Sequence, residues 1–324
     1  MRLHFFIPFS FALHRQTPFA SPELEKLLAA GRTEWRPIQL DTFFCTELGV
    51  KTLAGDSDFP LAAISLLGEP SAGEQSFQDN RWCMFADPVH LILQRDSFSL
   101  DVPVPLEVEA GEAGAIIEAL NQHFAVDGLH FFMGTSGRWY LTHGDPAGIV
   151  THHPELVAGR NIGPYLARGP DAAKWNQLTN EIQMLLFRHP VNHARESRGE
   201  TPLNSLWFHG AGKLPETTDA EKIDIYGNFP LASGVASLAG HACKPLPESP
   251  AGLHAVNDAW LYLDPADGAV RSWLSFAMKM IKTGEASSIR LSLGAAGGVR
   301  TCLVKPVDLW KFWRKTRPVI EYFV

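Results

Sequence analysis

The sequence contains few cysteines and few charged residues for its length. Its four cysteines stand far apart among 324 residues, and no two of them form a Cys-x-x-Cys pair. This spacing excludes a disulfide framework and a cysteine zinc ribbon, and it favours a reducing compartment, so we expect a cytoplasmic protein. Charged residues make up 19% of the chain, and the net charge is −7. An acidic chain of this kind argues against nucleic acid as the main partner.

Long hydrophobic runs are also missing. No apolar run reaches the ~20 residues that a membrane-spanning helix needs, so we expect no membrane partner. The apolar N-terminus after Arg2 has some features of a signal peptide, but Pro8 interrupts it and no small-residue cleavage site follows. We therefore interpret this segment as the buried first strand of an α/β sheet, whose two faces are both covered.

The residues that are present indicate an α/β fold with an insertion. Hydrophobic residues make up 45% of a chain that is too long for one small core. Segments 21–31 and 172–189 have helical spacing and capping signals, while 82–142 has a β-β-α-β-β pattern. The pattern predicts a mostly parallel sheet interrupted by a smaller α+β domain. We place the core at 1–75 and 172–324 and the inserted domain at 76–171.

A serine between two carboxylates is the first candidate site. Asp56, Ser57 and Asp58 follow Gly55 and precede an apolar segment. A serine in such a place serves as a nucleophile when a metal ion lowers its pKa. The alternative is a helix N-cap, which uses the same residue types.

Histidines form the second candidate group. The chain has 13, but none occurs in a His-Glu-x-x-His motif. Incidental histidines are therefore favoured over zinc ligands.

The third candidate is a segment rich in amides and arginines, which we call the polar segment 189–204. It contains Asn192, Arg195, Arg198 and Asn204. Two arginines and two asparagines around a tight turn suit a phosphate or carboxylate ligand. The alternative is a connection whose polar side chains satisfy its own backbone.

The last candidate is the C-terminal segment 310–317, in which tryptophans alternate with basic residues. Such a pattern occurs in proteins that bind anionic surfaces. We instead favour a terminal helix that packs its aromatic side chains on the body of the protein. Docking of a protein partner through this segment is a further hypothesis.

The polar segment also carries a family resemblance. The run HPVNHARESRGETPLNSLWFHGAGKLP resembles archaeal-type cofactor-independent phosphoglycerate mutases, which belong to the alkaline phosphatase superfamily. The segments QTPFASPELEKLLAAG and GDSDFPLAAISLLGEP resemble that family in the same order. RpfE-type bacterial regulatory proteins are also similar, through ADPVHL, NEIQMLL, HPVN, NSLWF and DLWKFWRK. The resemblance implies an alkaline-phosphatase-like core with an inserted domain.

Several residues depart from the pattern of these mutases. The resemblance implies two metal ions, held by carboxylates and histidines, that activate a serine. The place of the first ligand reads Phe6–Phe9 here, and a later Asp-His pair falls on the glycine-rich segment 294–298. Ser57 keeps the appearance of the nucleophile. The remaining weak metal candidates are Asp56, Asp58 and Asp264, so we expect no metal.

These departures favour a non-catalytic regulatory or metabolite-sensing protein. A phosphorylated metabolite would bind in the cleft between core and insertion, through Asn192, Arg195, Arg198 and Asn204. The alternative is an active phosphomutase or phosphatase that uses Ser57 and a manganese, magnesium or zinc ion.

Overall fold

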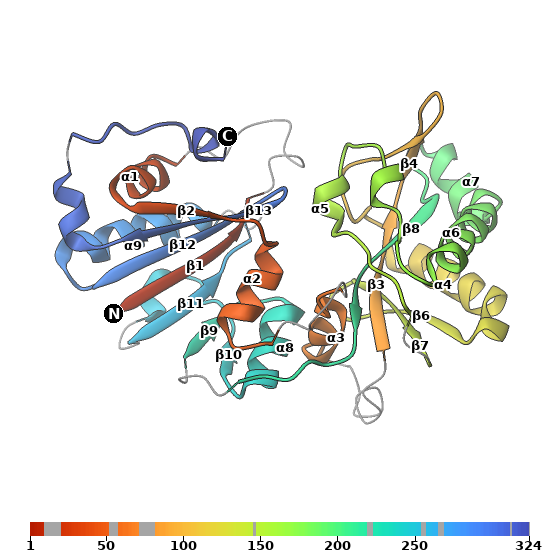
Figure 1. Cartoon of the computed structure of the whole chain (residues 1–324), viewed down its shortest axis with the longest axis horizontal. Helices are drawn as coiled ribbons and strands as arrows, with labels where there is room; N and C mark the ends of the chain where they lie inside the picture. The colour runs from red at the N-terminus through yellow and green to blue at the C-terminus, as the bar shows by residue number, and fades with distance from the viewer. Residues whose placement is uncertain are drawn as a thin grey trace. The chain divides into compact units, whose positions relative to one another are not determined.

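The structure is a computed structural model in which the chain forms two compact units (Figure 1). The first, which we call the core unit, contains Met1–Val50 and Thr217–Val324, and the second, the inserted unit, is Lys51–Glu216. The residues that the structure describes are 1–9, 21–51, 58–70, 82–144, 147–218, 223–253, 257–264, 269–311 and 313–323.

The core unit is built on a seven-stranded sheet in the order β10-β9-β11-β1-β12-β13-β2. The four neighbouring pairs from β10 to β12 are parallel, while β13 is antiparallel to both β12 and β2. This arrangement confirms the predicted α/β class with a mostly parallel sheet. Its strands are β1 (Arg2–Pro8), β2 (Arg32–Arg36), β9 (Asp224–Tyr226), β10 (Ala242–Lys244), β11 (Asp258–Tyr262), β12 (Ser288–Ala295) and β13 (Gly298–Val304).

The N-terminal segment forms the central strand β1, as predicted. Successive side chains of a strand point to opposite faces, and both faces of β1 are covered. Phe5 packs in one hydrophobic cluster with residues of α1 and α9, while Phe6 contacts Phe44 of α2 at a ring distance of 4.8 Å. Burial on both faces explains why this strand is almost continuously apolar. The helices are α1 (Pro22–Ala30), α2 (Leu40–Glu47), α8 (Pro230–Ala239) and α9 (Val270–Thr283), with short 3-10 turns η3 (Pro250–Leu253), η5 (Pro306–Trp310) and η6 (Val319–Tyr322).

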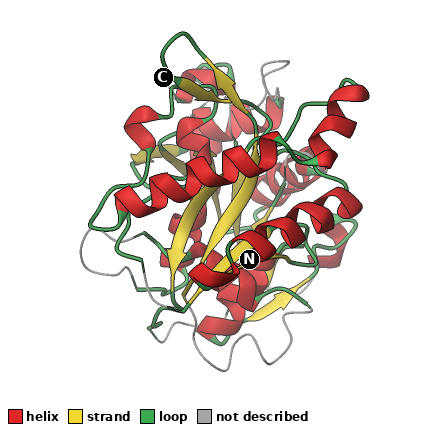
Figure 2. Cartoon of the chain, turned by 90° about the vertical axis from the view of Figure 1, so that its right-hand side faces the viewer, coloured by secondary structure: helices red, strands yellow, loops and turns green. Residues whose placement is uncertain are grey.

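The inserted unit has a four-stranded antiparallel sheet in the order β6-β7-β3-β8 and a separate β4-β5 hairpin. Helices α4 and α6 share a hydrophobic cluster with this sheet, and α3 contacts β3 and β8. Figure 2 shows the helices and strands of the whole chain in a view turned by 90° from that of Figure 1. The strands are β3 (Trp82–Val89), β4 (Leu91–Leu93), β5 (Phe98–Leu100), β6 (Leu129–Met133), β7 (Trp139–His143) and β8 (Ser205–Gly212). The helices are α3 (Leu61–Leu67), α4 (Ala110–His123), α5 (Pro154–Val157), α6 (Ala172–Phe187) and α7 (Pro190–Ser197), with 3-10 turns η1 (Ala125–Asp127) and η2 (Gly163–Tyr165).

The limits of the inserted unit differ from the predicted domain 76–171. Strand β8 pairs with β3 from Val89↔Ser205 to Cys83↔Gly212, so the chain up to 212 belongs to the same sheet as β3. Helix α3 packs on the same two strands and extends the unit towards the N-terminus. The inserted unit, with 166 residues, is therefore slightly longer than the core unit, with 158, whereas we expected a smaller domain.

The C-terminal segment also differs from its prediction. Trp310 is the last residue of the 3-10 turn η5, and no helix follows it in the described part of 311–317. The side chains of Trp310 and Trp313 are 78% and 67% exposed, so most of their surface does not pack on the body as predicted. Arg314 binds the body instead, because its Nη1 donates to the carbonyl oxygens of Ala29, Ala30 and Gly31 at the end of α1. A cation at the C-terminal end of a helix satisfies its unpaired carbonyls.

Within the described ranges, no helix has the length and apolar character needed to cross a membrane.

Candidate functional site

The polar segment 189–204 begins with helix α7 (Pro190–Ser197), and the tight turn expected within it follows at Arg198 and Gly199. His189 is the N-cap of α7 and accepts a hydrogen bond from the Val191 N–H at 3.3 Å, and Pro190 takes the first helical position. The helix ends at Ser197, and Gly199 has a φ of +74°. Proline therefore ends α6 as predicted but also starts the next helix.

Both asparagines of this segment bind backbone. Asn192 is buried; its amide donates to the carbonyls of Leu186 at 2.8 Å and Leu203 at 2.6 Å, and its oxygen accepts from the Leu203 N–H at 2.8 Å. Asn204 accepts from the Leu91 N–H at 2.7 Å and donates to the Leu91 carbonyl at 2.9 Å. Each side chain supplies hydrogen bonds that a backbone group would otherwise lack. This agrees with the alternative interpretation, in which the polar side chains of the segment satisfy backbone groups.

Two carboxylates pair with the two arginines. Glu200 lies 2.8 Å from Arg198 Nη2 and 3.9 Å from Arg195 Nη1. Glu112 of α4 accepts from Arg195 Nη1 and from Arg198 Nη2, each at 2.5 Å. Burial acts to raise the pKa of Glu112, but the hydrogen bonds from the two arginines outweigh it and hold that pKa below its ordinary value. Arg195 also donates to the carbonyls of Thr201 at 2.9 Å and Glu107 at 3.2 Å.

The arginines of the segment are thus brought together by Glu112, while Asn192 and Asn204 act at separate backbone positions. A phosphate group would have to displace Glu112 from the buried Arg195 before it could bind there. Its binding free energy would be reduced by the loss of these charge-assisted hydrogen bonds.

The serine and the weak metal candidates are only partly described. Asp56 and Ser57 lie outside the described residues. Asp58 accepts a hydrogen bond from the Thr151 N–H at 2.7 Å and another from the Thr151 hydroxyl. Asp264 is an exposed residue of the core unit, after β11. Among the described residues, no three His, Cys, Asp or Glu side chains are grouped as metal ligands would be. The expectation of no metal therefore remains a prediction.

A buried charged cluster in the inserted unit was not predicted. Asp87 of β3 accepts a hydrogen bond from His209 of β8 at 2.9 Å and forms an ion pair with Arg138 at 3.3 Å. The side chains of Asp87 and His209 are 1% and 2% exposed. The Arg138 guanidinium lies over the Phe85 ring, 4.2 Å from its centroid. We call Asp87, Arg138 and His209 the charged cluster.

Opposing effects determine the ionisation of this cluster. Burial acts to raise the pKa of Asp87, but the positive charge of Arg138 and the interaction with His209 outweigh it, so the pKa lies below its ordinary value. An ionised Asp87 orients the imidazole of His209, which is the arrangement used to position a histidine for proton transfer or polar recognition. A cavity of about 230 Å³ lies beside Asp87 and Arg138.

The distance between Asp87 and His209 along the chain explains why the sequence does not indicate this cluster. Asp87 and His209 are 122 residues apart and meet only through the pairing of β3 with β8. His209 is one of the 13 histidines, and no spacing in the sequence links it to a carboxylate. The motifs around the two residues, ADPVHL and NSLWFHG, contributed to the family resemblance without indicating this contact.

Glu69 forms a second buried arrangement after α3. Its carboxylate accepts from the Thr135 hydroxyl at 2.7 Å, the Ser136 N–H at 3.0 Å and the Tyr140 hydroxyl at 3.0 Å. Burial acts to raise the pKa of Glu69, but these hydrogen bonds and one from the Ser136 hydroxyl lower it overall. Glu69 therefore attaches the segment after α3 to the β6-β7 turn, a structural role that leaves its carboxylate fully engaged.

Comparison with known proteins agrees with the family resemblance. The chain is similar to curated proteins named 2,3-bisphosphoglycerate-independent phosphoglycerate mutase. The protein of Methanosarcina mazei is 28% identical over 223 residues, which are 66% of this chain and 53% of that protein. The protein of Methanosarcina barkeri is 32% identical over 140 residues, which are 41% of this chain and 35% of that protein. The predicted similarity to cofactor-independent phosphoglycerate mutases is therefore confirmed.

The similarity is partial in length. This chain spans about half the length of the Methanosarcina mazei protein and less of the Methanosarcina barkeri protein. No family model matches the chain. A solved structure of a cofactor-independent phosphoglycerate mutase from Thermoplasma acidophilum is 17% identical in sequence. The match covers 94% of this chain and 89% of the Thermoplasma chain, with a TM-score of 0.39.

Proposed function

We propose that the chain is a non-catalytic regulatory protein that binds a small metabolite on a phosphoglycerate-mutase-like scaffold. The observation that carries this proposal is the state of the polar segment 189–204. Arg195 and Arg198 are paired with Glu112, and Asn192 and Asn204 bind backbone. Arginine and asparagine are residue types that often bind phosphorylated substrates. In this chain they instead stabilise the inserted unit. The regulatory part of the proposal rests on the resemblance to RpfE-type proteins.

An active mutase or phosphatase is the second candidate. The names of the curated relatives favour it, and their similarity includes up to 66% of this chain. In this case Ser57 would be the nucleophile, and manganese, magnesium or zinc would lower its pKa. Asp56, Asp58 and Asp264 would be the candidate ligands in this chain. The described residues contain no group of three such ligands, and Asp56 lies outside them.

A turnover assay separates the two functions. The purified full chain is incubated with 3-phosphoglycerate and, in turn, Mn²⁺, Mg²⁺ or Zn²⁺, and phosphorus NMR follows formation of 2-phosphoglycerate and free phosphate. Ser57→Ala is the matched variant. We expect no product from either protein. Product that forms with one of these ions and disappears in Ser57→Ala would establish the second candidate and refute a non-catalytic role.

Calorimetry tests the phosphorylated ligand that the mutase resemblance suggests. The same protein is titrated with 3-phosphoglycerate, phosphoenolpyruvate and inorganic phosphate. Binding without turnover would support a sensor of phosphorylated metabolites. The absence of heat at millimolar ligand would exclude these three ligands and would direct attention to other cavities of the inserted unit.

A further inference from the structure

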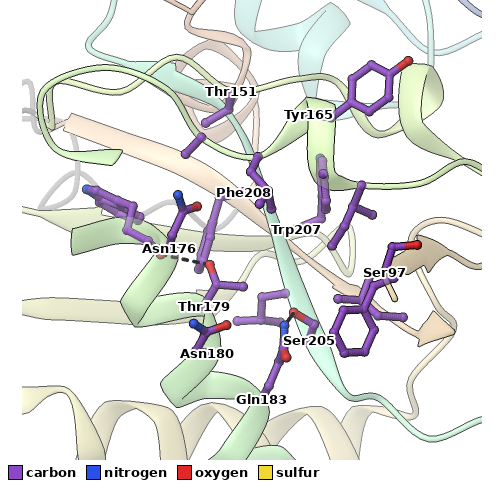
Figure 3. A pocket seen from close by; sticks show the side chains of 18 of the residues that line it. Ser97, Thr151, Tyr165, Asn176, Thr179, Asn180, Gln183, Ser205, Trp207 and Phe208 are labelled. Atoms are coloured by element: carbon purple, nitrogen blue, oxygen red, sulfur yellow. Dashed lines mark hydrogen bonds between the residues drawn. The ribbon is translucent and has the colours of Figure 1, made fainter. Parts of the chain in front are cut away.

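The inserted unit contains a cavity of about 360 Å³ that none of the sites described above includes. It lies between α6, strand β8, the segment at the β4-β5 turn and the segment around η2 (Figure 3). Its size is at the lower end of the range typical of small-molecule sites. The cavity combines an apolar interior with a few polar side chains, which is the usual composition of such sites.

One wall consists of polar side chains from a single face of α6. Asn176, Thr179, Asn180 and Gln183 follow helical spacing, and Figure 3 shows them on one side of the cavity. Within the described part of the chain, the side-chain amides of Asn176 and Asn180 have no hydrogen-bond partner. Gln183 makes one long contact, in which its Nε2 donates to the Ser205 hydroxyl at 3.5 Å. This wall therefore offers a ligand several side-chain amides, each with a donor and an acceptor side by side.

Aromatic side chains supply the apolar surface. Trp175, Trp207 and Phe208 line the cavity and are at least nine-tenths buried, while Phe98 is 38% exposed. The indole N–H of Trp207 donates to the His152 carbonyl at 2.8 Å, so the ring is fixed by a bond outside the cavity. Fixed aromatic rings beside free amides suit a flat ring with hydrogen-bonding groups along its edge.

The charge of the lining argues against a phosphate group as the main part of a ligand that this cavity would recognise. Among the described lining residues there is no lysine, arginine or histidine, and Asp96 is the one charged side chain. Arg160 donates to the Tyr165 hydroxyl at 3.4 Å but does not itself line the cavity. Carboxylates are common acceptors for ribose hydroxyls, and the negative charge of the exposed Asp96 at the mouth of a cavity without cations disfavours a phosphate group.

We propose that this cavity binds an uncharged nucleoside. The base would pack on the aromatic side chains and pair its edge with the amides of Asn176 and Gln183, since asparagine and glutamine offer the donor–acceptor pairs that match base edges. Asp96 and Ser97 would bind the sugar hydroxyls. This inference rests on the proposed function, because it names the class of metabolite that a regulatory protein of this kind would bind.

Calorimetric titration of the full chain tests the assignment. The probes are adenosine, uridine, adenosine monophosphate and D-ribose. We expect at least one nucleoside to bind with a Kd below about 1 mM, and the monophosphate to bind at least about tenfold more weakly than adenosine. Asp96→Asn is expected to narrow that difference, because it removes the like charge.

Two variants of α6 and one control locate the binding. Asn176→Ala and Gln183→Ala each remove a proposed hydrogen bond, and we expect a loss of about threefold to tenfold in nucleoside affinity. Gln177→Ala is the matched control, because Gln177 is an exposed amide on the same helix that does not line this cavity and bonds to Glu181. It should leave the affinity unchanged. Circular dichroism and thermal unfolding verify that each variant is folded.

Four outcomes would overturn the inference. They are the absence of nucleoside binding at millimolar concentration, equal or tighter binding of the monophosphate, binding of D-ribose alone, and an equal effect of Gln177→Ala. None of them depends on turnover of 3-phosphoglycerate. Failure of this inference is therefore distinguishable from failure of the non-catalytic role.

Discussion

The substitution Asp87→Asn tests whether burial or distance determines the strength of ion pairs in this protein. Asparagine has nearly the same shape as aspartate and keeps an oxygen that accepts the hydrogen bond from His209. The substitution therefore removes mainly the negative charge opposite Arg138. The affected ion pair is long, at 3.3 Å, but the carboxylate is 1% exposed.

The magnitude follows from the exposure of the two partners. Removing one member of a fully buried ion pair costs roughly 3–5 kcal/mol, because the other charge remains without compensation. The side chain of Arg138 is 36% exposed, so water recovers part of that cost. We expect Asp87→Asn to lower the free energy of unfolding of the inserted unit by about 2–3 kcal/mol.

The matched control is Asp258→Asn in the core unit. Asp258 pairs with Arg2 at a shorter distance of 2.7 Å, but the exposures are 20% and 61%. Exposed pairs contribute at most about 1 kcal/mol, so this substitution should have the smaller effect. Hydrogen exchange measured on peptides from β3 and β8, and from β1 and β11, reports the opening free energy of each unit separately.

The pH dependence gives a second test of the same substitution. The folded-state pKa of Asp87 lies below its ordinary value of 3.8. The stability that this carboxylate contributes is therefore present above the unfolded-state pKa and is lost as pH falls through the folded-state pKa. The difference between the parent protein and Asp87→Asn should be constant above about pH 5 and should shrink below about pH 4. An equal effect of the two substitutions at neutral pH, or a difference that grows on acidification, would refute the reasoning.

Three further predictions concern the polar segment and the thiols. Glu112→Gln removes the carboxylate that contacts both arginines at 2.5 Å, so calorimetry should detect inorganic phosphate binding that is absent in the parent protein. The same binding should be absent in Glu118→Gln, an exposed control on the same helix that contacts neither arginine. Asn192→Ala leaves buried backbone groups unpaired, and urea denaturation should show a loss of about 2–3 kcal/mol; a loss below about 0.5 kcal/mol would contradict this role. At pH 8 a colourimetric thiol reagent should modify Cys243 alone, because the other three cysteines are buried whereas Cys243 is partly accessible. Burial raises the pKa of all four thiols, that of Cys83 to about 12, so the reaction of Cys243 should be slow. Modification of a second thiol in the folded protein would be inconsistent with this burial.

Elements with local signals could be predicted from the sequence. The helix expected at 21–31 is α1, and Ser21 caps it by accepting a hydrogen bond from the Leu24 N–H at 3.3 Å. The buried character of β1 was visible in its continuous apolar run. These features depend on contacts within a few residues or on burial alone. Local contacts leave capping and periodic signals, and burial on both faces leaves a continuous apolar run.

Features that depend on pairing between distant strands could not be predicted. The domain limit at 171/172 was misplaced because β8 joins the sheet of β3, more than a hundred residues earlier in the chain. The contact between Asp87 and His209 has the same origin. Neither residue lies in a motif whose spacing specifies a partner, so their proximity follows only from the register of the two strands.

The polar segment 189–204 and helix α6 show that residue type alone does not predict which polar side chains are available to a ligand. Arg195 looked available for a ligand because its partner, Glu112, lies 83 residues away on another helix. The apolar spacing in 172–189 predicts helix α6 but does not indicate that its polar face lines a cavity. In the structure the segment's arginines are neutralised, whereas the amides of α6 line a cavity. Residue type alone therefore does not distinguish a ligand site from a structural contact; the partners supplied by distant parts of the chain determine which of the two a polar side chain forms.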